Sequence, residues 1–117
     1  MTTGTKTVMY PVKDIETAKK LYSQLFTVEP YADEPYYVGF KVDGQDVGLD
    51  PNGHSKGMTG PVAFWDVDDI AASVEALVGA GAEPVQPVTD VGGGKLIATV
   101  NDADGNVIGL LQDPAGG

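Results

Sequence analysis

Few side chains in this 117-residue chain could do chemistry, and they do not form a familiar catalytic set. His54 is the only histidine, and it could act as a general base or a metal ligand. It lies in a segment rich in glycine and proline, so we expect an exposed loop residue. No Ser/His/Asp arrangement is indicated, and the absence of cysteine excludes thiolate chemistry and disulfides.

Aspartates are the other reactive groups. Asp66, Asp68 and Asp69 stand close enough in sequence to suggest acid–base catalysis. They end an expected strand and precede an expected helix, where acids ordinarily cap the helix and face water. Acidic residues outnumber basic ones by 17 to 7, for a net charge of −10. Such a chain repels phosphate backbones and anionic membranes, so we expect neither nucleic acid nor a membrane as a partner.

Two copies of one unit make up the chain. Val12–Ile15 reappears at Val67–Ile70, an offset of 55 residues (69 minus 14), and Asp43–Leu49 reappears at Asp104–Leu110, an offset of 61 (110 minus 49). The copies therefore keep their order and differ by a loop insertion. We expect a single domain over residues 1–117, with a first module at 1–51, a linker at 52–60 and a second module at 61–117.

The first copy is expected to fold as βαβββ. Its strands are predicted at Thr5–Val12, Val28–Ala32, Tyr36–Val42 and Asp46–Asp50, and its helix runs from a cap at Asp14 to about Phe26. Proline interrupts the second strand, which marks it as an edge strand. The helix should bury one apolar stripe, made of Ile15, Ala18, Leu21, Tyr22 and Leu25.

The second copy repeats this order. A strand at Val62–Val67 precedes a helix that Asp69 caps and that ends at Gly79–Gly81, and strands follow at Lys95–Val100 and Asn106–Gln112. Strand alternation turns Trp65 toward this helix, so we expect it in the core. No apolar run approaches the ~20 residues needed to span a bilayer, and the N-terminus lacks the pattern of a secretory signal. We therefore expect a soluble cytoplasmic protein.

The repeated unit resembles the vicinal oxygen chelate superfamily, which includes glyoxalase I, extradiol dioxygenases, fosfomycin-resistance enzymes and bleomycin-binding proteins. The most specific stretches are Tyr10–Ile15, Leu77–Pro84 and Asp102–Leu110, and the resemblance covers the whole chain. It implies an α+β fold, the glyoxalase/bleomycin resistance fold, in which two tandem βαβββ modules form curled mixed sheets around a cleft. In that superfamily a homodimer usually completes the cleft, which holds a metal in the enzymes and a drug in the binding proteins.

The metal ligands of the superfamily are missing from this sequence. Relatives carry them near the start of each copy's first strand and on each copy's last strand, and these positions fall here on Thr7, Val62, Gly48 and Gly109. Valine and glycine have no side chain that could ligate, and a divalent ion needs about three or four protein donors. We therefore expect no family-type metal site, no cofactor and no catalytic residue.

An apolar cleft is what remains. If the former ligand positions face the cleft, alternation turns Tyr10, Leu49 and Leu110 toward the helices. The residues expected to bind a ligand are Met9, Tyr37, Gly48, Asp50, Phe64, Gly109 and Leu111. Two glycines beside Met9 and Phe64 leave room for a flat or apolar molecule, and Asp50 could anchor a cationic group. The alternative is that Met9 and Phe64 fill the cleft and make a solid core.

These observations favour a metal-free, glyoxalase-like protein that binds a small organic molecule and acts as a homodimer. The ligand could be a cationic drug, as in antibiotic resistance by bleomycin-binding relatives. One alternative is a lyase- or dioxygenase-type enzyme of the same fold, working without a metal or with one held by Asp50 and His54 across a dimer. A structural or regulatory partner module is a third reading, and the ligand's identity stays open.

Overall fold

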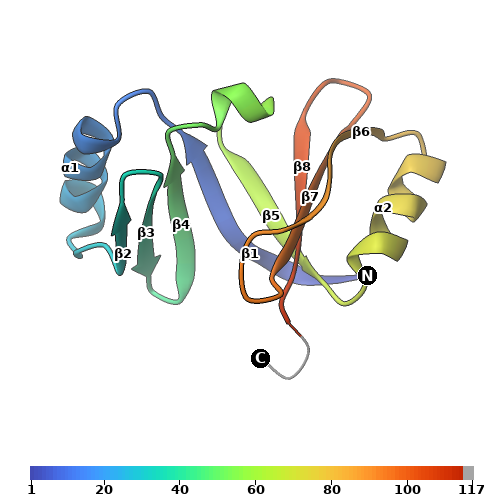
Figure 1. Ribbon diagram of the computed structural model, residues 1–117, viewed down its shortest axis with the longest axis horizontal. Helices are drawn as coiled ribbons and strands as arrows, with labels where there is room; N and C mark the ends of the chain where they lie inside the picture. The colour runs from blue at the N-terminus through green and yellow to red at the C-terminus, as the bar shows by residue number, and fades with distance from the viewer. Residues whose placement is uncertain (115–117) are drawn as a thin grey trace. The chain divides into compact units, whose positions relative to one another are not determined.

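The computed structural model describes residues 1–114, and residues 115–117, the end of the predicted second module, lie outside the described residues. The elements are β1 (Thr2–Pro11), α1 (Ile15–Phe26), β2 (Ala32–Glu34), β3 (Tyr37–Val42), β4 (Gln45–Asp50), η1 (His54–Lys56), β5 (Val62–Val67), α2 (Ile70–Gly79), β6 (Glu83–Asp90), β7 (Leu96–Asn101) and β8 (Val107–Gln112) (Figure 1). The predicted α+β class and the repeated βαβββ order are confirmed. Among the described residues, no helix is both long and apolar enough to cross a membrane.

The chain divides into two compact units. The N-terminal unit is Thr7–Val62, and the C-terminal unit combines Met1–Lys6 with the chain from Ala63 onward. β1 therefore belongs to both units, because its first residues lie with β5. There, Thr2 Oγ1 donates a hydrogen bond to the carbonyl of Asp66 (2.6 Å), and Thr3 Oγ1 donates to Oδ2 of the same residue (3.2 Å).

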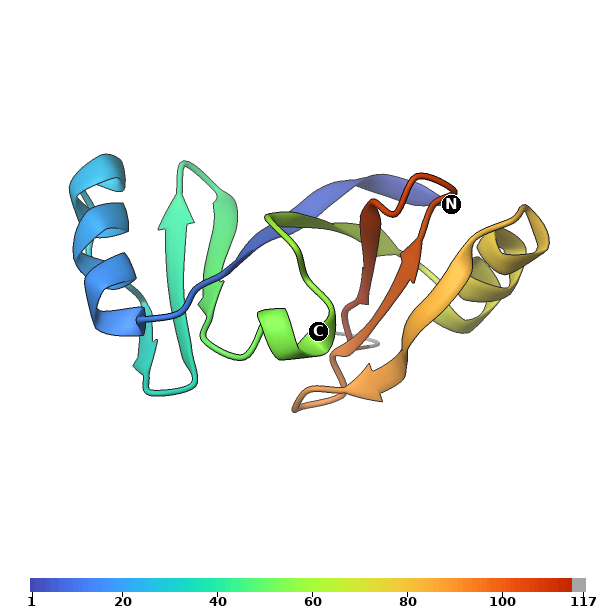
Figure 2. The same cartoon turned by 90° about the horizontal axis from the view of Figure 1, so that it is seen from above.

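In the N-terminal unit the strands lie in the order β2-β3-β4-β1, with β1 parallel to β4 and the other pairs antiparallel. α1 stands beside this sheet (Figure 2) and covers the core formed by Val38, Phe40, Val47 and Leu49. Aromatic rings join the layers: the centroids of Tyr22 and Tyr10 are 5.0 Å apart, and those of Phe26 and Phe40 are 5.3 Å apart. Asp14 caps α1 as predicted, accepting hydrogen bonds from the N–H groups of Glu16 and Thr17.

The C-terminal unit has the same plan, with the strand order β5-β8-β7-β6 and β5 parallel to β8. Its core contains Val67, Ile70, Ala98 and Leu110, against which Val74 and Leu77 of α2 pack. The predictions that Tyr10, Leu49 and Leu110 pack on the helix side of their sheets are therefore confirmed.

Three local predictions are wrong. Leu21 and Leu25 are 65% and 69% exposed, because the face of α1 that meets the sheet carries Ile15, Ala18, Tyr22 and Phe26. Trp65 is 38% exposed and not buried in the core. The edge strand β2 begins at Ala32 instead of ending there, since Thr27 adopts a left-handed conformation and Pro30 has no N–H to donate.

Candidate functional site

Three of the predicted ligand-binding residues come together on the face of the N-terminal sheet that is opposite α1. Strand register places Gly48 of β4 beside Met9 of β1 on one side and Gly39 of β3 on the other. A Cβ atom at Gly48 would lie 2.7 Å from Sδ of Met9 and 2.8 Å from Cε1 of Tyr37. Met9 and Tyr37 therefore cover the position at which the superfamily resemblance implies a metal ligand.

Tyr37 lies over both glycines of this row. A Cβ atom at Gly39 would be 2.9 Å from Cε2 of Tyr37 and 2.9 Å from Cζ of Tyr31. Burial raises the pKa of Tyr37, and a side-chain hydrogen bond with Tyr31 and the nearby carboxylates of Asp46 and Asp50 raise it further. The phenol of Tyr37 is accordingly neutral at physiological pH, and it offers a ring face and a hydroxyl.

Asp50, the predicted anchor for a cation, already has partners. Its Oδ2 atom lies 2.8 Å from Nζ of Lys56, and its Oδ1 accepts a hydrogen bond from the N–H of Asn52 (2.8 Å). Lys56 lies in η1, a short 3₁₀ helix inside the predicted 52–60 linker, and its partner Asp50 is only 6% exposed. His54 begins the same helix and is exposed, as expected of a loop residue.

Sequence reasoning missed a second ion pair on this face. Nζ of Lys41 lies 2.9 Å from Oδ1 of the buried Asp46 and 5.9 Å from the centre of the Tyr31 ring. The hydrogen bond to Asp46 and its charge raise the pKa of Lys41. Lys41 and Asp46 are register partners, so the Asp43–Gly44 hairpin together with strand alternation could have identified them.

The residues of the C-terminal unit that were predicted to bind a ligand are buried, and two of them pack directly against each other. Phe64 is in register with Gly109, and a Cβ atom at Gly109 would lie 2.6 Å from Cδ2 of Phe64. Phe64 is 2% exposed and Leu111 is 4% exposed. The space that Gly109 leaves is therefore filled by the ring of Phe64 within this unit.

The residues present do not fit the metal that the superfamily resemblance implies. The four ligand positions hold a threonine, a valine and two glycines, namely Thr7, Val62, Gly48 and Gly109. Within residues 1–114, no three or more His, Cys, Asp or Glu side chains gather in a way that could hold a metal ion. The donor chemistry at these positions is therefore unsuited to a divalent ion.

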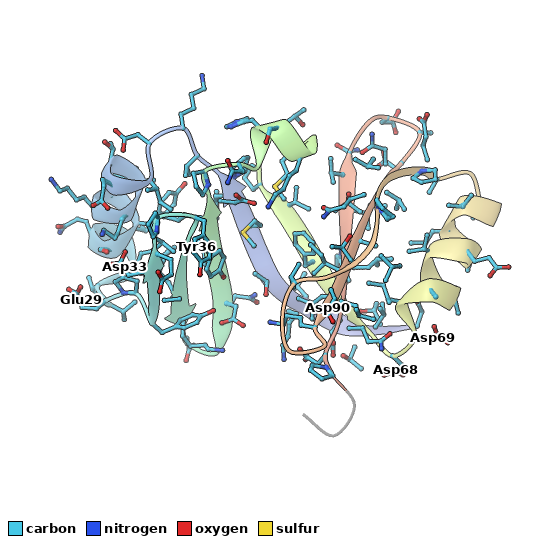
Figure 3. All side chains as sticks on the ribbon, viewed as in Figure 1. Glu29, Asp33, Tyr36, Asp68, Asp69 and Asp90 are labelled. Carbon is cyan, nitrogen blue, oxygen red and sulfur yellow. The ribbon has the colours of Figure 1, made fainter. Side chains whose placement is uncertain are left out.

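Asp68 and Asp69 lie at the N-terminal end of α2 (Figure 3). Asp69 accepts a hydrogen bond from the N–H of Ala72 (3.1 Å), which caps α2, and Asp66 accepts the hydrogen bond from Thr3 described above. Asp68 is exposed. These observations agree with the expectation of capping and solvation.

A surface hollow that no sequence pattern indicated lies beside α1. Its volume is about 520 Å³, and it is lined by Lys19, Lys20, Ser23, Gln24, Glu29, Pro30 and Asp33. Figure 3 shows Glu29 and Asp33 beside the end of α1. Lys19 forms ion pairs with Asp33 (3.2 Å) and Glu16 (3.1 Å), so this hollow is an open, polar part of the surface.

Comparison with known proteins gives a family and several similar folds. The sequence model of the Glyoxalase/Bleomycin resistance protein/Dioxygenase superfamily matches residues 4–110. No curated protein matches the sequence.

Among solved structures, a superfamily member from Vibrio splendidus 12B01 is 19% identical with a TM-score of 0.71, covering 92% of this chain and 97% of that one. Methylmalonyl-CoA epimerase from Mycobacterium tuberculosis is 19% identical with a TM-score of 0.68, covering 97% and 89%. The Mn(II)-bound glyoxalase from Novosphingobium aromaticivorans is 19% identical with a TM-score of 0.68, covering 96% and 39%. At these identities the likeness concerns the fold.

Proposed function

The chain belongs to the Glyoxalase/Bleomycin resistance protein/Dioxygenase superfamily, and we propose that it is a metal-independent binding protein for a small organic molecule. One observation carries the proposal. At Gly48 and Gly109, where relatives hold metal ligands, the neighbouring groups are the thioether of Met9 and the rings of Tyr37 and Phe64. Soft apolar groups of this kind suit an organic ligand and cannot replace the carboxylate and imidazole donors of a divalent ion.

The ligand that we propose is an apolar, flat molecule that carries a positive charge. The thioether of Met9 and the ring of Tyr37 provide apolar contact area. The net charge of −10 attracts cations over the whole molecule. Since Asp50 is already paired with Lys56, the cation is drawn by this overall field and not by an unpaired buried carboxylate. The planar aromatic rings and the cationic tail of a bleomycin-type drug match this description, and sequestration of such a drug would confer antibiotic resistance.

The enzyme alternative has less support. A metal held by Asp50 and His54 would need the carboxylate of Asp50 as a ligand, but its two oxygens already accept hydrogen bonds from Lys56 and Asn52. Methylmalonyl-CoA epimerase and the Mn(II)-bound glyoxalase share the fold with this chain, and one fold of this kind serves many different functions. We therefore place binding ahead of catalysis, with two copies forming a homodimer.

Calorimetric titration tests the proposal. Protein freed of metal by a chelator is titrated separately with Zn²⁺, Ni²⁺, Mn²⁺ and metal-free bleomycin, and light scattering reports the oligomeric state. We expect saturable binding of bleomycin and no stoichiometric metal binding. Met9→Ala should weaken the binding of bleomycin by at least about 5-fold, whereas the control Tyr36→Ala, a change at an exposed residue, should change it by less than about 2-fold. One tightly bound metal ion per chain would contradict the proposal.

A further inference from the structure

The two modules differ in one row of residues across the sheet. In the N-terminal unit, strand register aligns Gly39, Gly48 and Met9 across β3, β4 and β1. In the C-terminal unit, the corresponding row across β7, β8 and β5 is Thr99, Gly109 and Phe64. The N-terminal row therefore has two adjacent residues without side chains, and we call Gly39 and Gly48 the two-glycine floor.

The two rows are also covered differently. In the C-terminal unit, Phe64 and Thr99 are 2% and 3% exposed, so that row is closed. In the N-terminal unit, the floor is covered by the ring of Tyr37, which is only half-buried. A half-buried ring on a floor without side chains can leave by rotation about its own side-chain bonds, without any movement of the backbone.

We propose that the two-glycine floor is a binding site for a neutral, planar phenolic ring, and that Tyr37 is its internal occupant, which swings out to admit the ligand. The side chain of Tyr37 is itself a para-substituted phenol, and its position shows that such a ring fits between Met9 and Tyr31 over the glycine backbone. This inference rests on the proposed function and names the ring of the cationic ligand that the floor would hold and the place where that ring binds.

The surroundings of the floor select a neutral phenol over a phenolate. The hydroxyl of Tyr37 shares a hydrogen bond with Tyr31, and the carboxylates of Asp46 and Asp50 lie near enough to disfavour a negative charge on Tyr37. A ligand ring in the same place would find the same hydroxyl partner and the same repulsion of negative charge. Lys41 does not reverse this preference, because its Nζ is paired with Asp46 at 2.9 Å.

Tyr37 competes with any ligand for the floor. A tethered group acts as a competitor with an effective concentration in the millimolar range, so the wild-type protein should bind a single phenol weakly. Removal of the Tyr37 ring abolishes this competition and leaves an apolar cavity that a phenol can fill. We therefore expect truncation of Tyr37 to raise the affinity by at least about 10-fold.

The experiment uses p-cresol, which is the tyrosine side chain as a free molecule. It is titrated into four proteins: wild type, Tyr37→Ala, the double variant Tyr37→Ala/Gly48→Ala and the control Tyr36→Ala. Binding is followed by calorimetry and by the NMR signals of the tyrosine rings, and thermal unfolding establishes that each variant is folded. The added methyl group at Gly48 fills the floor; of the three atoms nearest to it in the wild type, two belong to Tyr37 and the third is Sδ of the flexible Met9 side chain.

We expect saturable binding to the wild type with a shift of the Tyr37 ring signals, at least about 10-fold tighter binding to Tyr37→Ala, and loss of that gain in the double variant. Tyr36→Ala should behave as the wild type. Absence of saturable binding to the wild type overturns the proposal, even if Tyr37→Ala binds, since that cavity would be a product of the substitution. If Tyr37→Ala/Gly48→Ala binds p-cresol as tightly as Tyr37→Ala does, the proposal is also overturned.

The wild-type titration needs no variant, so the proposal stays testable if Tyr37→Ala does not fold. The result is also separable from that of the proposed function. Wild-type protein that binds bleomycin but not p-cresol would refute the phenol site and leave the proposed function standing. Protein that binds p-cresol and also holds one tightly bound metal ion per chain would refute the metal-independent function and leave the phenol site standing.

Discussion

Lys56 Nζ lies 2.8 Å from Oδ2 of Asp50, so a carboxylate that the sequence offered as an anchor for an external cation is neutralised by the chain itself. Asp50 is buried, and removal of its partner would leave a buried charge without a counter-ion. Because the Lys56 side chain is 45% exposed and water can partly replace it, we expect Lys56→Ala to lower the free energy of unfolding by about 1–3 kcal/mol.

Urea unfolding measures this effect, with Lys13→Ala, a change at an exposed lysine, as the control. The same variant should bind a cationic ligand more tightly than the wild type, because the carboxylate of Asp50 becomes available. A loss of less than about 0.3 kcal/mol would mean that the ion pair does not contribute to stability.

Gly109 is expected to tolerate no side chain. A methyl group there would lie 2.6 Å from Cδ2 of Phe64, inside a closed contact, and overpacking of this kind costs about 1–3 kcal/mol. Gly109→Ala should therefore lower the unfolding free energy by that amount in a urea titration. Gly60→Ala is the matched control, since a methyl group there meets nothing within 4 Å. Equal stabilities of the two variants would refute the close contact between Phe64 and Gly109.

The first turn of α2 depends on a residue far away in sequence. Gln112 Oε1 accepts a hydrogen bond from the N–H of Ile70 at 2.8 Å, across 42 residues. Gln112→Leu keeps the size of the side chain but leaves this N–H without its partner, so we expect a loss of about 1 kcal/mol in the free energy of unfolding. Gln24→Leu, on the exposed side of α1, should change it by less than about 0.5 kcal/mol. Equal effects of both changes would show that the hydrogen bond from Ile70 to Gln112 does not stabilise the protein.

The free energy of unfolding should decrease in acid because of two carboxylates, one that caps α1 and one in a turn. Hydrogen bonds from Thr17 lower the pKa of Asp14, and hydrogen bonds from Asn106 lower that of Asp102, each from an ordinary value of 3.8. A carboxyl group with a lowered pKa in the folded state contributes stability that is fully present above 3.8 and is lost as the pH falls through the folded pKa.

Urea unfolding at about pH 5 and about pH 3 should therefore show lower stability at the acidic pH. Asp102→Asn should make this decrease smaller, because the amide does not titrate. A decrease of the same size in Asp102→Asn and wild type would exclude a contribution from Asp102.

The sequence predicted well those features that depend on neighbouring residues. The caps at Asp14 and Asp69 depend on amides within three positions. The two-residue repeat of strands assigned Tyr10, Leu49 and Leu110 to the helix side. The superfamily resemblance, combined with this repeat, predicted that Met9, Tyr37 and Gly48 line one cleft, and in the structure the side chains of Met9 and Tyr37 both lie against Gly48.

Features that depend on tertiary packing were predicted less well. Leu21 and Leu25 continue an apolar stripe on α1, but the sheet meets the adjacent row that ends at Phe26, and the sequence pattern does not distinguish the two rows. The pairing of Asp50 with Lys56 needs the η1 turn, which no pattern in the 52–60 linker indicated.

We propose above that this member of the superfamily binds an organic molecule without a metal. Native mass spectrometry of protein purified in the absence of chelator tests it most directly, because one spectrum reports the oligomeric state, bound metal and retained small molecules. We expect a dimer that carries additional organic mass and no metal. Zinc, nickel, manganese or iron bound in a ratio of one ion per chain would contradict it.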